Sequence, residues 1–145
     1  MRWIMVGALF LLAAGVSLAD LSRVRAEPNL EKRSKLALDN AVAALKEARE
    51  AYNAGDLEKA TAKAAEVQES AELAFTSLVK TGKDPRKSPK WFKRAEIESR
   101  DLLRSIETLQ HDMSIDDRVI LEKAREKVQQ VHDDLLTGLM EGKRK

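Results

Sequence analysis

The sequence has no cysteine and only two histidines among its 145 residues. The absence of cysteine excludes a disulfide framework, a thiolate metal site, a lipid-modified N-terminal cysteine and covalently attached c-type haem. The sequence also shows no catalytic nucleophile motif, glycine-rich phosphate loop or zinc motif. These absences remove the function classes that are easiest to recognise, and we expect a protein that is not an enzyme and holds no cofactor.

Signals for β-strands are scarce as well. Prolines occur only at positions 28, 85 and 89, and aromatic residues make up 4% of the chain. Ala, Leu, Glu, Lys and Arg dominate instead, and this composition is typical of helices. The sequence therefore predicts an all-α protein.

The first 19 residues differ in composition from the rest. After Met1-Arg2, an uncharged run of 17 residues extends from Trp3 to Ala19, whereas a membrane-spanning helix needs about 20. A basic start, an apolar centre and small residues at the end are typical of an export signal. We expect cleavage after Ser17-Leu18-Ala19, with Val24-Arg25-Ala26 as a less central site, and a periplasmic or extracellular location. The alternative is an uncleaved N-terminal membrane anchor.

Four later segments repeat apolar residues at alternating steps of three and four, which places these residues on one face of a helix. The segments are 29–53, 57–81, 89–112 and 115–141. We call the residues at these repeated positions the seam residues. In the order of the four segments they are Leu38, Ala41, Leu45, Ala48 and Tyr52; Leu57, Ala60, Ala64, Val67, Ala71, Ala74 and Leu78; Phe92, Ala95, Ser99, Leu102, Ile106, Leu109 and Met113; and Leu121, Ala124, Val128, Val131 and Leu135. We expect four residues beside the seams to widen the core: Val42, Phe75, Leu103 and Leu136.

The segment boundaries carry turn and capping residues. Gly55 and Asp56 can end the first helix and cap the second, and Gly82 can end the second. Ser88-Pro89 is a start signal for the third helix, and Ser114 with Asp117 resembles a capping box for the fourth. Because the first and third connections are short, they predict antiparallel neighbours.

The fold expected from these signals is an antiparallel up-down-up-down four-helix bundle with coiled-coil-like packing, preceded by a signal peptide. Its organisation would be a signal peptide or uncleaved anchor at 1–19, a flexible segment at 20–28, the bundle at 29–141 and a basic tail at 142–145.

One stretch is strongly basic in a chain that is nearly neutral. The chain has 26 Lys or Arg residues against 24 Asp or Glu, yet residues 79–95 hold seven bases and one acid, Asp84. The overall balance gives no reason to expect binding to nucleic acid. The candidate residues for binding an anionic surface are Lys80, Lys83, Arg86, Lys87, Lys90, Trp91, Lys93 and Arg94.

The predicted topology places this stretch at one end of the bundle. Arg23, Arg25 and the final Lys143-Arg144-Lys145 would join it there, and the opposite end would hold Asp56, Glu58, Asp112, Asp116 and Asp117. The ordinary explanation is that these charges keep loops soluble and complement the ends of helices. The functional explanation is a surface for an anionic membrane, a cell-wall polymer or an acidic protein, with Trp91 and Phe92 either anchoring there or closing the core.

A small-molecule site is the alternative function. The predicted architecture is similar to that of periplasmic b-type cytochromes, which ligate haem with Met and His from the first and last helices. Here segment 29–53 has no Met, so the resemblance leaves only His132 with Met113 or Met140. The Glu-x-x-His pairs of di-iron bundles are absent, because Thr108 and Gln129 precede the histidines by three residues.

The sequence thus favours an exported, non-enzymatic helical bundle that acts by interaction, as a scaffold, an adaptor or an envelope-associated binding module. A bundle that binds haem or another small molecule stays open beside it. The alanine-rich seam of segment 57–81 also permits close pairing with a second chain, so self-association is a further expectation.

Overall fold

The computed structural model describes residues 20–142, and every regular element among them is helical. The helices are α1 (Leu21–Arg25), α2 (Leu30–Asn53), α3 (Leu57–Lys80), α4 (Lys90–Asp112) and α5 (Glu122–Glu141), with a 3₁₀ helix η1 (Ile115–Leu121) before α5. The prediction of an all-α protein with several packed helices is confirmed. The predicted signal peptide at 1–19 and residues 143–145 of the basic tail lie outside the described residues.

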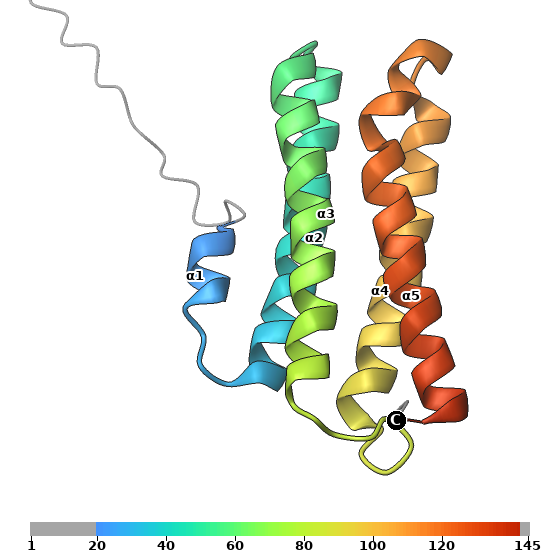
Figure 1. Cartoon of the computed structure of the whole chain (residues 1–145). Coiled ribbons are helices and arrows are strands. Elements are labelled where there is room, and N and C mark those ends of the chain that lie inside the picture. The colour runs from blue at the N-terminus through green and yellow to red at the C-terminus, as the bar shows by residue number, and fades with distance from the viewer. Residues whose placement is uncertain (1–19, 143–145) are drawn as a thin grey trace, which may run out of the picture.

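The four long helices run side by side in alternating directions (Figure 1). The connected helices α2 and α3 form one antiparallel pair, and α4 and α5 form the other. The two pairs meet with α3 against α5 and α2 against α4, and in both of these contacts the helices are parallel. The connector at 81–89 therefore crosses the bundle diagonally, and nine extended residues can reach about 30 Å.

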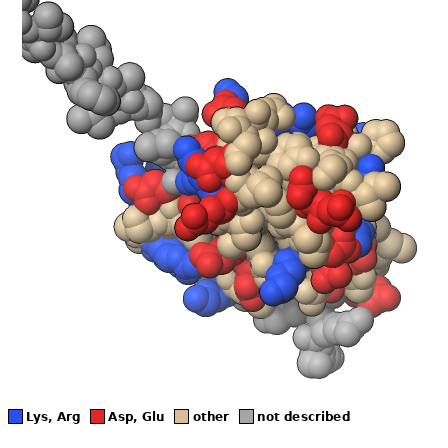
Figure 2. Space-filling model, turned by 90° about the horizontal axis from the view of Figure 1, so that it is seen from above, with Lys and Arg blue, Asp and Glu red and all other residues tan. Residues whose placement is uncertain are grey.

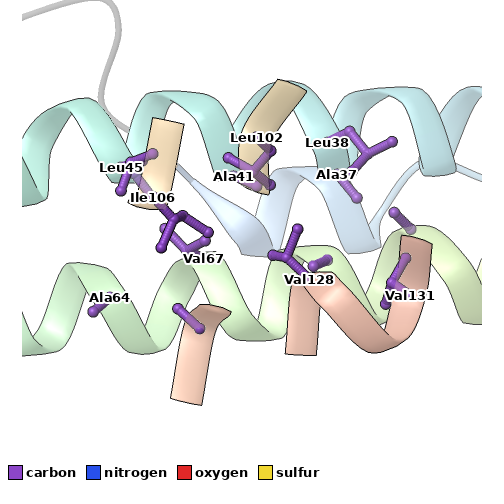
Figure 3. Packing of buried hydrophobic residues seen from close by; sticks show 14 of the residues in the cluster. Ala37, Leu38, Ala41, Leu45, Ala64, Val67, Leu102, Ile106, Val128 and Val131 are labelled. Carbon is purple, nitrogen blue, oxygen red and sulfur yellow. The ribbon is translucent and has the colours of Figure 1, made fainter. Parts of the chain in front are cut away.

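The seam residues form the hydrophobic core as predicted. Ile106 and Val128 have no exposed surface, and Leu102 and Val67 lie beside them in the same cluster (Figure 3). Of the seam positions, Leu57 is the exception, because it is the first residue of α3 and is 44% exposed.

Two of the four residues expected to widen the core lie outside it. Phe75 and Leu103 are partly buried against the core, whereas Val42 is 56% exposed and Leu136 is 40% exposed. Val42 lines an open groove of about 350 Å³ between α2 and α4. Since α2 packs more closely on α3 than on α4, this side of the helix stays open to solvent.

The α2–α3 pair combines alanine packing with a polar network. Asn40 Nδ2 donates to Ser70 Oγ at 3.0 Å, and Lys63 Nζ lies 2.8 Å from Glu47 Oε2. The hydrogen bond with Glu47 raises the pKa of Lys63, while burial raises the pKa of the Glu66 carboxyl against the opposing effect of Lys63. Small apolar side chains let the two helices approach, and these polar contacts fix their register.

The predicted boundaries of α2, α3 and α4 agree with the observed ones to within one residue. Asn29 Oδ1 accepts a hydrogen bond from Lys32 N at 2.9 Å at the start of α2, and Asp56 Oδ1 accepts one from Lys59 N at 3.0 Å at the start of α3. Gly55 and Gly82 have φ values of 78° and 68°. Glycine adopts this left-handed conformation without the penalty that a Cβ would impose.

Two segments differ from the expectation. Residues 20–28, expected to be a flexible segment, contain α1, whose Leu21 and Val24 side chains are buried. Five helical residues are too few to show a periodic pattern, so periodicity did not predict α1. The predicted helix 115–141 begins as η1 and becomes an α-helix only at Glu122.

Candidate functional site

The eight candidate residues lie together at one end of the helices, and we call them the basic surface. Lys80 is the last residue of α3, Lys83, Arg86 and Lys87 belong to the connector, and the remainder form the first turns of α4. The described residues at the end of α5 lie there too, because a Cβ on Gly142 would come within 3.0 Å of the Arg86 side chain. The connector therefore lies beside the C-terminal end of the last helix, as predicted.

Local hydrogen bonds hold the connector in a defined shape. Asp84 Oδ1 accepts a hydrogen bond from Arg86 N at 2.9 Å, and the Asp84 carbonyl accepts one from Ser88 N at 2.9 Å. Pro85 is buried and lies over Gly138 of α5, where an added Cβ would meet the proline ring at 3.2 Å. The basic residues of the connector thus project from a turn that is packed onto the helices.

The cations of the basic surface fall into two groups. Lys83 forms an ion pair with Glu31 of α2, and Arg94 Nε lies 3.1 Å from Glu98 Oε1 on its own helix. The other five form none of these ion pairs and are exposed: Lys80, Arg86, Lys87, Lys90 and Lys93. This second group gives the surface its positive field.

The two aromatic residues at the start of α4 have different environments. Phe92 is 5% exposed and belongs to the core, as predicted for a seam residue. Trp91 is half-buried, and both Lys90 Nζ and Arg94 Cζ stack on its ring, at 5.4 and 5.8 Å from the ring centroid. These cation–π contacts hold two of the positive charges beside the indole.

A cavity of about 310 Å³ opens beside the basic surface, between α3, the connector, α4 and α5. Its walls are mainly apolar, and its rim carries Lys83 and Asp134; the apolar lining comes from Phe75, Val79, Pro85, Phe92 and Leu135. No sequence pattern predicted this cavity, because its walls come from four separate parts of the chain.

The N-terminal arginines do not lie at the basic surface. Helix α1 folds back along α2 and α3 (Figure 1), so Arg25 Nη2 lies 3.9 Å from Glu69 Oε2 in the middle of α3. The expectation that Arg23 and Arg25 would join the basic end is wrong for this reason. Burial of Leu21 and Val24 draws the segment away from that end.

The opposite end carries the expected acids. The first residues of α3, the last of α4 and η1 meet there, and they include Asp56, Glu58, Asp112, Asp116 and Asp117. Figure 2 looks onto this end and shows acidic side chains spread across it, with neutral surface between them and most Lys and Arg toward the rim. Basic residues also lie at this end, where Arg49 Nη1 is 3.2 Å from Asp112 Oδ2 and Arg118 follows Asp117.

The two histidines lie apart from the basic surface. His132 Nε2 is 3.1 Å from Glu96 Oε1 of α4, and His132 Nδ1 is 3.6 Å from Asp133. His111 is exposed near the C-terminal end of α4. Across residues 20–142, no three His, Asp or Glu side chains group in a way that could hold a metal ion.

Comparisons with known proteins supply no family for this chain. No family model matches it, and no curated protein or solved structure was found to be similar. Of the helices between residues 20 and 142, none has the length and apolar character that crossing a bilayer requires.

Proposed function

We propose that this chain is an exported, non-enzymatic interaction protein that attaches to an anionic membrane through its basic surface. Residues 29–141 would serve as the rigid support, as one antiparallel up-down-up-down bundle with coiled-coil-like packing. In this proposal the protein is an envelope-associated binding module, and the helices hold the charged connector in place.

The observation that supports the proposal is a group of five exposed cations on the connector and the adjoining turns of α3 and α4. Lys80, Arg86, Lys87, Lys90 and Lys93 lie within one end of the molecule, whereas ion pairs engage Lys83 and Arg94. Each Lys or Arg near an anionic bilayer contributes on the order of 1 kcal/mol of binding free energy. Half-buried Trp91 adds an indole at the same end, and indoles favour the interface between lipid and water.

Co-sedimentation with lipid vesicles tests the proposal. The protein is purified in the processed form that cells produce and mixed with phosphatidylglycerol-containing vesicles or with pure phosphatidylcholine vesicles. We expect binding to the anionic vesicles only, and we expect salt to weaken it, since attraction between exposed charges fades over about 8 Å at physiological ionic strength.

A matched pair of variants locates the contact. The first carries Lys80→Glu, Arg86→Glu, Lys87→Glu and Lys93→Glu, and the second carries Lys46→Glu, Lys59→Glu, Arg104→Glu and Lys123→Glu. All eight residues are exposed and both variants change the net charge equally. We expect the partition coefficient between anionic vesicles and solution to fall at least about 100-fold for the first variant. The second variant should keep most of the wild-type partition coefficient.

The outcomes separate the remaining partners. Equal losses by both variants would show that net charge, and not the basic surface, drives binding. No binding by the wild-type protein at low salt would overturn the membrane proposal. Capture by purified anionic cell-wall polymer or by an acidic protein could then be measured with the same two variants.

A further inference from the structure

Two aliphatic side chains are strongly exposed at the acidic end. Ile115 is 80% exposed and Val119 is 72% exposed, and both belong to η1. Leu57, 44% exposed, begins α3 at the same end. Exposed aliphatic residues that gather at one place on a soluble domain mark a site of contact with another molecule more often than scattered ones do.

Ile115 and Val119 are exposed because η1 is held in a fixed conformation, and not because a helix end has frayed. Tyr52 Oη accepts a hydrogen bond from Ser114 N at 3.0 Å and donates one to Asp117 Oδ2 at 2.9 Å. At the other end of η1, Leu121 is completely buried in the core. A turn fixed at both ends presents its outward side chains in one orientation, which lowers the entropy lost on binding.

Acidic residues outnumber basic ones beside these aliphatic side chains along the chain, where Arg118 is the basic neighbour of Val119. Asp112, whose Oδ2 lies 3.2 Å from Arg49 Nη1, precedes Ile115 by three residues, and Asp116 and Asp117 follow it directly. Asp56 and Glu58 flank Leu57. A partner for this end should therefore offer an apolar hollow surrounded by positive charge.

The opposite end of the same chain offers such a hollow. The cavity of about 310 Å³ is lined by Phe75, Val79 and Leu135, and Val79 itself is 56% exposed at its wall. Lys83 and Asp134 lie on the rim, and Lys80 and Arg86 are exposed on the neighbouring backbone. The two ends are complementary in both polarity and charge.

We propose that the protein self-associates head to tail, with Ile115 and Val119 of one copy entering the basic-end cavity of the next. The acidic residues around η1 would then face the basic surface of the partner copy. Such a contact joins two different surfaces, so it propagates into chains or rings and does not stop at a symmetric dimer. The partner is a second copy because one chain carries both halves of the complementary pair.

The first experiment uses variants that each disable one end. Ile115→Glu with Val119→Glu disables the acidic end, and Val79→Glu disables the cavity. Val42→Glu is the matched control, since Val42 is also a valine with 56% exposure but lies on α2 away from both ends. Circular dichroism confirms that each variant is folded before its mass is measured by sedimentation.

We expect the wild-type protein and Val42→Glu to increase in mass with concentration and to dissociate in high salt. Each end-disabled variant should be monomeric alone, because losing one buried aliphatic contact weakens association by about tenfold or more. A mixture of the two should form a one-to-one dimer and nothing larger. Each variant supplies the end that the other lacks, so a symmetric interface could not give this result. A mixture that stays monomeric would overturn the proposal, as would a monomeric wild-type protein.

A cross-linking experiment tests the contact even if Val79→Glu fails to fold. The chain has no cysteine, so Ile115→Cys and Val79→Cys each carry a single thiol. Mild oxidation of their mixture should give a mixed disulfide dimer, whereas Ile115→Cys with Val42→Cys should not. Equal yields from the two mixtures would contradict docking of Ile115 at the cavity.

These tests are independent of the proposed membrane attachment. Assembly is measured without lipid, and the Ile115→Glu, Val119→Glu variant keeps every residue of the basic surface. That variant should still bind anionic vesicles if the membrane proposal is right. Since both interactions use the basic end, bound vesicles should compete with assembly.

Discussion

At the scale of single residues, burial separates the side chains that specify the fold from those available for binding. Ile106 on α4 is completely buried, while Arg104, two residues before it, is exposed and lines the groove between α2 and α4. The same helix thus supplies a core contact and a solvent-facing charge within one turn. A pair of substitutions at these sites measures how much of the stability comes from the predicted seam.

Ile106→Ala should destabilise the protein by about 2 to 5 kcal/mol, because it removes buried methylene groups and leaves a cavity. The melting temperature should fall by on the order of 10 °C. Arg104→Ala should change the free energy of unfolding by less than about 0.5 kcal/mol, since it is an exposed position. Urea denaturation followed by circular dichroism measures both values, and similar values for the two variants would show that the seam assignment is wrong.

At the scale of elements, the hydrogen bonds of Tyr52 explain why the last long helix begins with η1. The Tyr52 hydroxyl bridges Ser114 N and Asp117 Oδ2, and Ser114 Oγ donates to the same carboxylate at 2.8 Å. In a capping box the carboxylate would accept from the backbone N–H of Ser114. Here the tyrosine takes that donor, so a residue from α2 determines the geometry at the start of η1.

Tyr52→Phe should therefore loosen η1 more than the rest of the molecule. We expect a loss of about 1 kcal/mol in the free energy of unfolding and faster hydrogen exchange of the amides at 114–121. Thr61→Ala is the control, because it removes an exposed hydroxyl that bonds within α3. Unchanged exchange at 114–121 in Tyr52→Phe would mean that packing of Leu121 alone positions η1.

At the scale of the whole molecule, the position of α1 bears on the predicted processing. Asp20 Oδ1 accepts a hydrogen bond from Ser22 N at 3.1 Å and so caps α1. Leu21 and Val24 of this helix are buried against the bundle. Cleavage after Ala19 would leave the capped helix intact, whereas cleavage after Ala26 would remove both buried side chains.

We predict that the exported protein begins at Asp20. Intact-mass analysis of the protein recovered from cells decides between Asp20, Glu27 and Met1 as the first residue. A protein that retains Met1 and is extracted only with detergent would show that the segment 1–19 serves as an anchor. A start at Glu27 would show that the packing of α1 does not restrict the choice of cleavage site.

The linear sequence determined which residues form the four long helices, apart from the 3₁₀ start before the last one, and which face each of these helices buries. Alternating steps of three and four located the buried faces of all four long helices, because an apolar face must turn toward its neighbours wherever these lie. Gly55, Asp56 and Gly82 marked boundaries, because a turn or a cap depends on residues nearby in the chain. The positive charge of the connector was equally visible, since all its residues lie within one stretch.

Only the tertiary structure decided how the two antiparallel helix pairs meet and what their meeting created. The parallel contacts of α3 with α5 and of α2 with α4 depend on the diagonal path of the connector, and periodicity on one helix does not specify its partner. Those contacts formed the apolar cavity, left Val42 exposed and paired Lys83 with Glu31. Each of these features joins segments far apart in the chain, so its cause lies in packing and not in local pattern.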